Sequence, residues 1–105
     1  MTFVNLTPHT INVRLANGSF RTIEPSGTVA RVSSVTEVVK TIEGINIVKQ
    51  TFGEITGLPE FEQDTYYIVS RMVKDRLTGY DNVLVPGAPI RDEKSVIIGA
   101  DGLSL

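Results

Sequence analysis

The chain has 105 residues, of which 41% are hydrophobic and 21% charged, and its formal net charge at pH 7 is -2. These values are typical of a single globular domain over residues 1–105, and they exclude a positive field able to hold duplex nucleic acid. The absence of cysteine excludes disulfides, thiolate zinc sites and cysteine nucleophiles, and it suits a reducing cytoplasm. Neither an export signal nor a membrane-spanning apolar run is indicated, so we expect a cytoplasmic protein without a membrane partner.

The N-terminal third predicts a meander of strands. Residues 11–15 alternate between apolar and polar, which indicates a half-buried strand, and Asn17-Gly18 supplies a tight turn to a returning strand over 20–24. After the turn residues Pro25-Ser26-Gly27, alternation resumes over 28–33. We therefore expect three consecutive antiparallel strands.

The central region predicts a second hairpin. Two runs rich in β-branched residues, 38–42 and 45–52, flank Glu43-Gly44. The segment 53–59 contains two glycines and a proline, so we expect it to bend the chain through a bulge or a loop. Residues 59–64 are expected to be an exposed loop.

A buried-strand pattern beginning at Tyr66 runs into a short helical pattern that ends before Gly79. The helix is indicated by apolar residues at helical spacing, namely Val69, Met72, Val73 and Leu77. Residues 82–86 indicate a strand parallel to the Tyr66 strand, with the helix as the crossover and Pro86-Gly87 as its end.

The C-terminal region predicts a last hairpin, in which 89–91 and 95–99 flank Asp92-Glu93-Lys94, followed by a tail over 99–105. The fold class is therefore mainly β, a small antiparallel barrel or sandwich of hairpins with one short helix. A small core and unpaired strand edges favour a homo-oligomer.

The strand-to-helix junction is the one place where the sequence suggests an anion site. Ser70 and Arg71 stand where the first free amide groups of the helix point outward, so a hydroxyl, a guanidinium and N–H groups could meet a phosphate together. The structural alternative is that Ser70 is only the N-cap.

Two further residues are candidates for ligand contacts. Arg91 precedes an acidic turn on an otherwise apolar strand, so we expect a half-buried guanidinium with Asp92 or a phosphate as its partner. His9, the only histidine, lies in a turn between two short strands. It could serve as a general base or a ligand contact, or its segment could simply form turn hydrogen bonds.

Other candidate constellations are weaker. The carboxylates of Asp92, Glu93 and Asp101 lack the ligand alternation of a calcium loop, so we interpret them as solvated turn residues and predict no metal site. We likewise predict no catalytic group and no cofactor. Aromatic residues near the helix could wall a nucleobase or, as is more common, pack in the core: Phe61, Tyr66, Tyr67 and Tyr80.

Several segments resemble a family of short proteins encoded by phages, prophages and some bacteria, which open with an Asn-Leu-Thr-Pro-His motif. The resemblance covers nearly the whole chain and implies a phage setting, but it transfers no activity and no functional residue. The segments that carry it are Val4–His9, Phe52–Pro59, Tyr67–Ser70, Ile90–Glu93 and Ile97–Gly99.

Two functions follow as hypotheses. By analogy with small phage proteins that sequester nucleotide signals of Thoeris and cyclic-oligonucleotide immunity, the first is a non-enzymatic counter-defence sponge in the host cytoplasm that captures a small nucleotide-like ligand. The alternative is a structural or partner-binding phage accessory protein, which contacts another protein through an exposed strand edge or the 59–64 loop.

Overall fold

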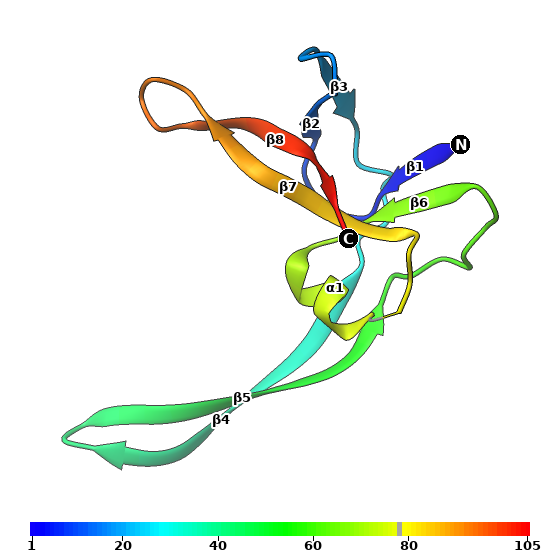
Figure 1. Cartoon of the computed structure of the whole chain (residues 1–105). Coiled ribbons are helices and arrows are strands. Elements are labelled where there is room, and N and C mark those ends of the chain that lie inside the picture. Colours follow the sequence, from blue (N-terminus) through cyan, green and yellow to red (C-terminus); the bar gives the residue numbers. More distant parts are fainter. Residues whose placement is uncertain (78) are drawn as a thin grey trace.

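The structure, a computed structural model, describes residues 1–77 and 79–105. These residues form eight strands and one short helix, which confirms the mainly β fold class (Figure 1). Six strands belong to one sheet and the other two form a separate hairpin. The strands are β1 (Thr2–Asn5), β2 (Ile11–Arg14), β3 (Phe20–Ile23), β4 (Arg31–Ile42), β5 (Ile45–Thr56), β6 (Thr65–Ile68), β7 (Val83–Arg91) and β8 (Ile97–Ser104), and the helix is α1 (Arg71–Arg76).

The six-stranded sheet has the order β1-β6-β7-β8-β2-β3 and is mixed. The pairs β1/β6, β6/β7 and β8/β2 are parallel, whereas β7/β8 and β2/β3 are antiparallel. An isolated bridge between Asn5, at the end of β1, and Pro25, just after β3, brings the two ends of the sheet together. The sheet is therefore nearly closed and barrel-like.

The strand-helix-strand unit forms as the sequence predicts. The Tyr67–Val83 pairing is parallel, and α1 lies in the crossover between these strands. Val73 is the buried residue of α1 and belongs to the same core cluster as Val83 and Val85. A second cluster, on the other side of β6, gathers around Ile68 with Ile11, Val13 and Ile23.

The predicted meander is wrong beyond its first hairpin. The Asn17-Gly18 hairpin is confirmed, but β3 pairs only with β2, and the predicted strand over 28–33 is replaced by β4, which begins at Arg31. Ala30 instead donates its N–H to the Leu6 carbonyl. Because β4 finds its partner in β5 rather than in β3, it leaves the barrel instead of continuing it.

The expected bend occurs within residues 53–59. A register shift opposite Val32 and Ser34 marks a bulge in β5 near Gly53, which confirms a bulge there, yet β5 continues to Thr56. The chain turns at Gly57, where φ is +82°. A Cβ there would collide with the carbonyl oxygen of Val29, so a residue without a side chain is required.

Pro86-Gly87 does not end β7, and the expected tail is strand β8. Beyond Leu84 no residue of β7 pairs with β6, so the missing N–H groups of Pro86 and Pro89 break no ladder on that side. A Cβ at Gly87 would collide with the Asp101 carbonyl, so glycine permits the close approach of β8. The last hairpin is confirmed, and it is longer than the sequence indicates.

The hairpin of β4 and β5 projects from the barrel as a long arm (Figure 1). The radius of gyration is 17.0 Å, whereas a compact domain of this length has about 13 Å. We call residues 31–56 the arm. Its root residues Val32 and Ile55 pack against a core cluster, whereas its apolar residues from Val35 to Val48 are exposed.

Candidate functional site

Ser70 is the N-cap of α1. Its hydroxyl accepts the Val73 N–H at 3.5 Å, and its backbone is extended, as an N-cap requires. The side chain lines a depression of about 220 Å³ together with Thr7, Pro8 and Arg31. Small-molecule sites have volumes of roughly 300 to 1,000 Å³, so this depression is too small for a nucleotide.

Arg71 lines an adjoining groove rather than this depression, and Met72 lines both. Its side chain is exposed and lines a groove of about 560 Å³ between α1 and the root of the arm. We call this the root groove. Its lining is Phe52, Arg71, Met72, Asp75 and Arg76.

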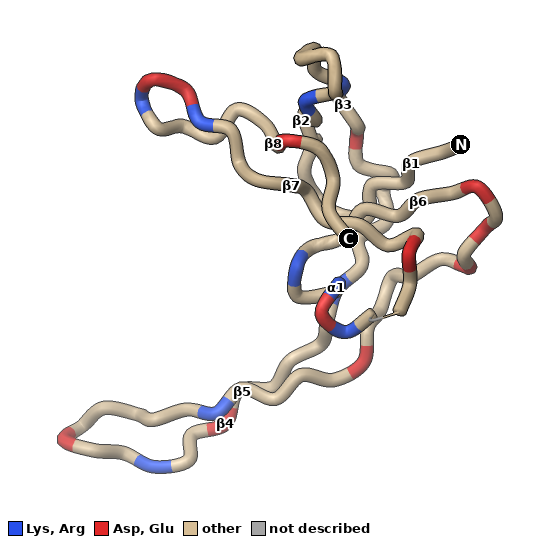
Figure 2. Tube along the Cα trace, in the orientation of Figure 1, with Lys and Arg blue, Asp and Glu red and all other residues tan. Residues whose placement is uncertain are grey.

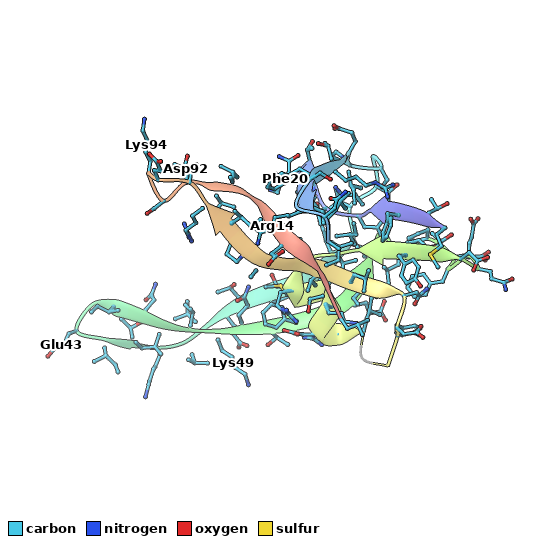
Figure 3. The ribbon with its side chains drawn as sticks, turned by 45° about the horizontal axis from the view of Figure 1, so that its top comes forward. Arg14, Phe20, Glu43, Lys49, Asp92 and Lys94 are labelled. Atoms are coloured by element: carbon cyan, nitrogen blue, oxygen red, sulfur yellow. The ribbon has the colours of Figure 1, made fainter. Side chains whose placement is uncertain are left out.

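Arg91 does not join either place, and the expectation of a half-buried side chain paired with Asp92 is wrong. Arg91 is exposed and donates from Nη1 to the Ser95 carbonyl at 2.9 Å. It lies about 20 Å beyond Val85 along β7, at roughly 3.3 Å per residue. Asp92 accepts the Lys94 and Val96 N–H groups and holds its own turn, near the hairpin tip (Figure 3). The Arg91 side chain is exposed because this end of β7 extends beyond its pairing with β6 and pairs only with β8.

His9 lies in the turn between β1 and β2, and its side chain is exposed. Its carbonyl accepts Asn5 Nδ2 at 2.8 Å and the Thr7 hydroxyl at 3.2 Å. The alternative interpretation, a segment held by turn hydrogen bonds, therefore describes this position.

The opening motif has a structural explanation in Asn5. Asn5 is 1% exposed; Nδ2 also donates to the Ile23 carbonyl at 3.1 Å, and Oδ1 accepts the Thr7 N–H at 2.9 Å. One amide thus ties β1 to the end of β3 and orders the turn that contains His9. The motif, through Asn5, therefore helps to close the barrel.

Three of the four aromatic residues, Phe61, Tyr66 and Tyr80, line one depression of about 340 Å³, and the ring centroids of Phe61 and Tyr80 are 5.3 Å apart. Tyr67 is buried and stacks on Phe61 at 4.8 Å between centroids, and its hydroxyl accepts the Glu62 N–H at 2.8 Å. Tyr66 points to the other side and packs against Phe3 at 5.6 Å. Because neighbouring strand residues face opposite sides, core packing is the role of Tyr67.

Within the described residues, no three His, Asp or Glu side chains gather closely enough to hold a metal ion. In that same part of the chain, no helix has the length and apolarity needed to cross a membrane. Lys and Arg residues stand singly among acidic residues rather than in a continuous stripe (Figure 2).

The arm is the surface that sequence reasoning missed. Its apolar side chains project to solvent on both sides (Figure 3), with Val35 69% and Ile45 64% exposed. The sequence predicts this hairpin but not its exposure, because adjacent apolar residues usually indicate burial on both faces. The exposed apolar residues are Val35, Val38, Val39, Ile42, Ile45, Ile47 and Val48.

The two faces of the arm differ in charge. Residues paired across the two strands share a face, and successive residues alternate between faces. One face, which we call the uncharged face, carries Phe52, Gln50, Val48 and Asn46 of β5 opposite Ser34, Thr36, Val38 and Thr41 of β4. The opposite face carries Thr51, Lys49, Ile47 and Ile45 of β5 opposite Val35, Glu37, Lys40 and Ile42 of β4.

Comparisons with protein-family models, curated proteins and solved structures found no match to this chain. The functional argument therefore depends on the geometry of the arm, the root groove and the barrel.

Proposed function

We propose that this chain is a non-enzymatic assembly protein that binds protein subunits through the arm. The observation that carries the proposal is the set of seven large apolar side chains left exposed between Val35 and Val48. Exposed contiguous apolar surface is typical of protein interfaces, and each of the two strands has an unpaired edge. In the phage setting that the sequence resemblance suggests, this is a structural or partner-binding accessory protein.

The arm suits a protein partner better than a small ligand. It offers two free strand edges for β-augmentation and two extended faces, but no enclosed pocket. Small ligands bind in concave sites that bury most of their surface, whereas protein partners bind extended surfaces. The shape therefore favours a macromolecular partner.

Capture of a nucleotide-like ligand stays a prediction that this geometry favours less. Ser70 and Arg71 line two adjoining depressions that share Met72, whereas Arg91 lies near the tip of another hairpin, so the three residues do not form one phosphate site. Mass spectrometry of small molecules released from the denatured protein tests this hypothesis, and a bound nucleotide would restore it.

Cross-linking of lysines in cells that produce the protein tests the proposed function. Lys40 and Lys49 lie on the arm, whereas Lys74 is on α1 and Lys94 is at the tip of the other hairpin. We expect mass spectrometry to find links from Lys40 or Lys49 to another polypeptide, whether identical or different. Intermolecular links confined to Lys74 and Lys94 would contradict the proposal.

A further inference from the structure

We infer that the partner of the arm is a second copy of this chain, and that two arms pack antiparallel through the face that carries the tip isoleucines. We call this the mixed face. The second copy specifies the partner of the proposed function, on which this inference rests. The mixed face consists of Val35, Glu37, Lys40 and Ile42 of β4 and Ile45, Ile47, Lys49 and Thr51 of β5.

The mixed face carries most of the exposed apolar side chains of the arm. Four of the seven project from it, namely Val35, Ile42, Ile45 and Ile47. The uncharged face carries two, Val38 and Val48, among hydroxyl and amide side chains. Since stabilisation by burial grows with the apolar area removed from water, a second sheet gains most by covering the mixed face.

A bulge in β4 creates the mixed face. Val39 has no partner in the register between β4 and β5. Glu37 and Lys40 therefore share a face, although a spacing of three residues puts side chains on opposite faces of a regular strand. The bulge thus sets an acid and a base next to each other on one face of the same strand.

The order of side chains on the mixed face is self-complementary when it is reversed. Along β4 it is apolar, acidic, basic, apolar, given by Val35, Glu37, Lys40 and Ile42. A second copy turned end for end places base on acid, acid on base, and apolar on apolar at both ends. A two-fold dimer requires this kind of pattern, because the same patch meets itself, whereas an unrelated partner does not.

The residues of β5 fit the same arrangement. Ile45 then faces Thr51 of the second copy, and Ile47 faces Lys49. Because β5 is an edge of the two-stranded arm, Lys49 can cover Ile47 with its hydrocarbon stem and keep its ammonium group in water.

The contact supplies charge partners that the chain itself does not. Neither Glu37 nor Lys40 forms an ion pair with another described residue of its own chain. In the antiparallel dimer each Glu37 faces Lys40 of the other copy, so two charge pairs form about the axis. Parallel arms would instead leave both Lys40 side chains opposite Ile47, and burial of an unpaired charge is costly.

The shape of the molecule allows this packing. The two-fold axis passes the row of Val38 and Val48, and Thr56, at the root, lies roughly 26 Å from it at 3.3 Å per residue. The two barrels therefore lie at opposite ends of the paired arms (Figure 1). Eight side chains from each copy form a small interface, so we expect a dissociation constant in the micromolar range.

A charge exchange followed by sedimentation equilibrium tests the contact. Glu37→Lys and Lys40→Glu should each raise the dimer dissociation constant at least about tenfold, because each sets like charges opposite each other. An equimolar mixture of the two variants should form dimers again, because opposite charges then face each other in both pairs. Single variants that associate as the natural chain does, or a mixture that stays monomeric, would overturn the inference.

Thr36→Lys is the matched control for the added charge. Thr36 neighbours Glu37 but lies on the uncharged face, so this variant should dimerise as the natural chain does. Both positions are exposed, so thermal denaturation of the monomers should show equal stability. Equal weakening by Thr36→Lys and Glu37→Lys would overturn the assignment of the face.

A pair of apolar variants tests the isoleucines. Ile45→Thr keeps a β-branched side chain but removes apolar surface from the mixed face, and we expect the dissociation constant to rise about fivefold. Val48→Thr makes the same kind of change on the uncharged face and should leave it unchanged. The reverse order of effects would contradict the inference.

A distance between two spin labels tests the antiparallel orientation. The chain has no cysteine, so Glu43→Cys places a single label at the tip of each arm. Antiparallel arms hold the two tips about 30 Å apart, at roughly 3.3 Å per residue, whereas parallel arms bring them together. A distance below about 20 Å by double electron–electron resonance would overturn the orientation.

These results separate the inference from the proposed function. If the natural chain stays monomeric at high micromolar concentration while Lys40 or Lys49 cross-links to a different protein, the second-copy inference fails and the proposed function stands. If the arm lysines link to no polypeptide, both fail.

Discussion

At the scale of single residues, the side chains of Asn5, in β1, and Ser70, at the start of α1, stabilise the fold. Asn5 and Ser70 both belong to segments that the sequence suggests as functional, and the side chains of both form hydrogen bonds with backbone groups. Sequence reasoning could identify Ser70 as an N-cap because capping is local. It could not identify the role of Asn5, because Ile23 is distant in sequence.

Replacement of Asn5 should destabilise the barrel. Asn5→Ala removes the donor to the His9 and Ile23 carbonyls and the acceptor for Thr7, so we expect the free energy of unfolding to fall by about 3 kcal/mol. Thr7→Val removes only a hydroxyl from the same network and should cost less than about 1 kcal/mol. Urea denaturation measures both, and equal small losses would contradict this role for Asn5.

Ser70 and Arg71 should differ in their effects on folding. Ser70→Ala removes the cap of a short helix and should cost about 0.5 kcal/mol, because the capping bond is long. Arg71→Ala should leave the free energy of unfolding within about 0.5 kcal/mol, since the side chain is exposed. Thermal denaturation compares them, and an unfolded Arg71→Ala protein would show that Arg71 supports the fold.

At the scale of elements, local turn chemistry was predictable and strand extent was not. The turns at Asn17-Gly18 and Glu43-Gly44 form where the sequence places them, because their backbone preferences are local. The lengths of β4, β7 and β8 depend on which distant strand each one meets. The run Pro86-Gly87 shows this, since proline ends a strand only where a neighbour needs its N–H.

Gly57 should be more sensitive to substitution than Gly44, although both have φ of +82°. Gly57→Ala adds a collision with the Val29 carbonyl to the conformational cost, whereas a Cβ at Gly44 meets open space. We expect a loss above about 2 kcal/mol for Gly57→Ala and about 1 kcal/mol for Gly44→Ala. Similar losses in urea denaturation would mean that the Val29 contact relaxes.

The outer part of the arm should be dispensable for folding. Removing Glu37 to Lys49 and joining the paired residues Thr36 and Gln50 by Asn-Gly keeps the register at the root. At sub-micromolar concentration, where mass action no longer favours assembly, the melting temperature should fall by no more than about 2 °C. A much larger fall in a calorimetric scan would show that the arm supports the barrel.

At the scale of the whole molecule, the protein combines a small barrel with an arm whose root residues Val32 and Ile55 pack against the core and whose outer apolar residues are exposed. The mainly β class followed from hairpin signals along the chain, but the division into barrel and arm did not, because apolar strand patterns do not show which surface covers them. The radius of gyration, 17.0 Å, is large for a chain of this length because the arm projects from the barrel.

Sedimentation equilibrium of the intact chain and of the shortened chain tests the central claim most directly. The claim is that the arm binds a protein and that this protein is a second copy. We predict that the intact protein passes from 11.5 kDa to twice that mass as its concentration rises through the micromolar range, whereas the shortened chain stays at the mass of one chain. Indistinguishable association of the two proteins, with both remaining monomers or both forming dimers, would contradict the account.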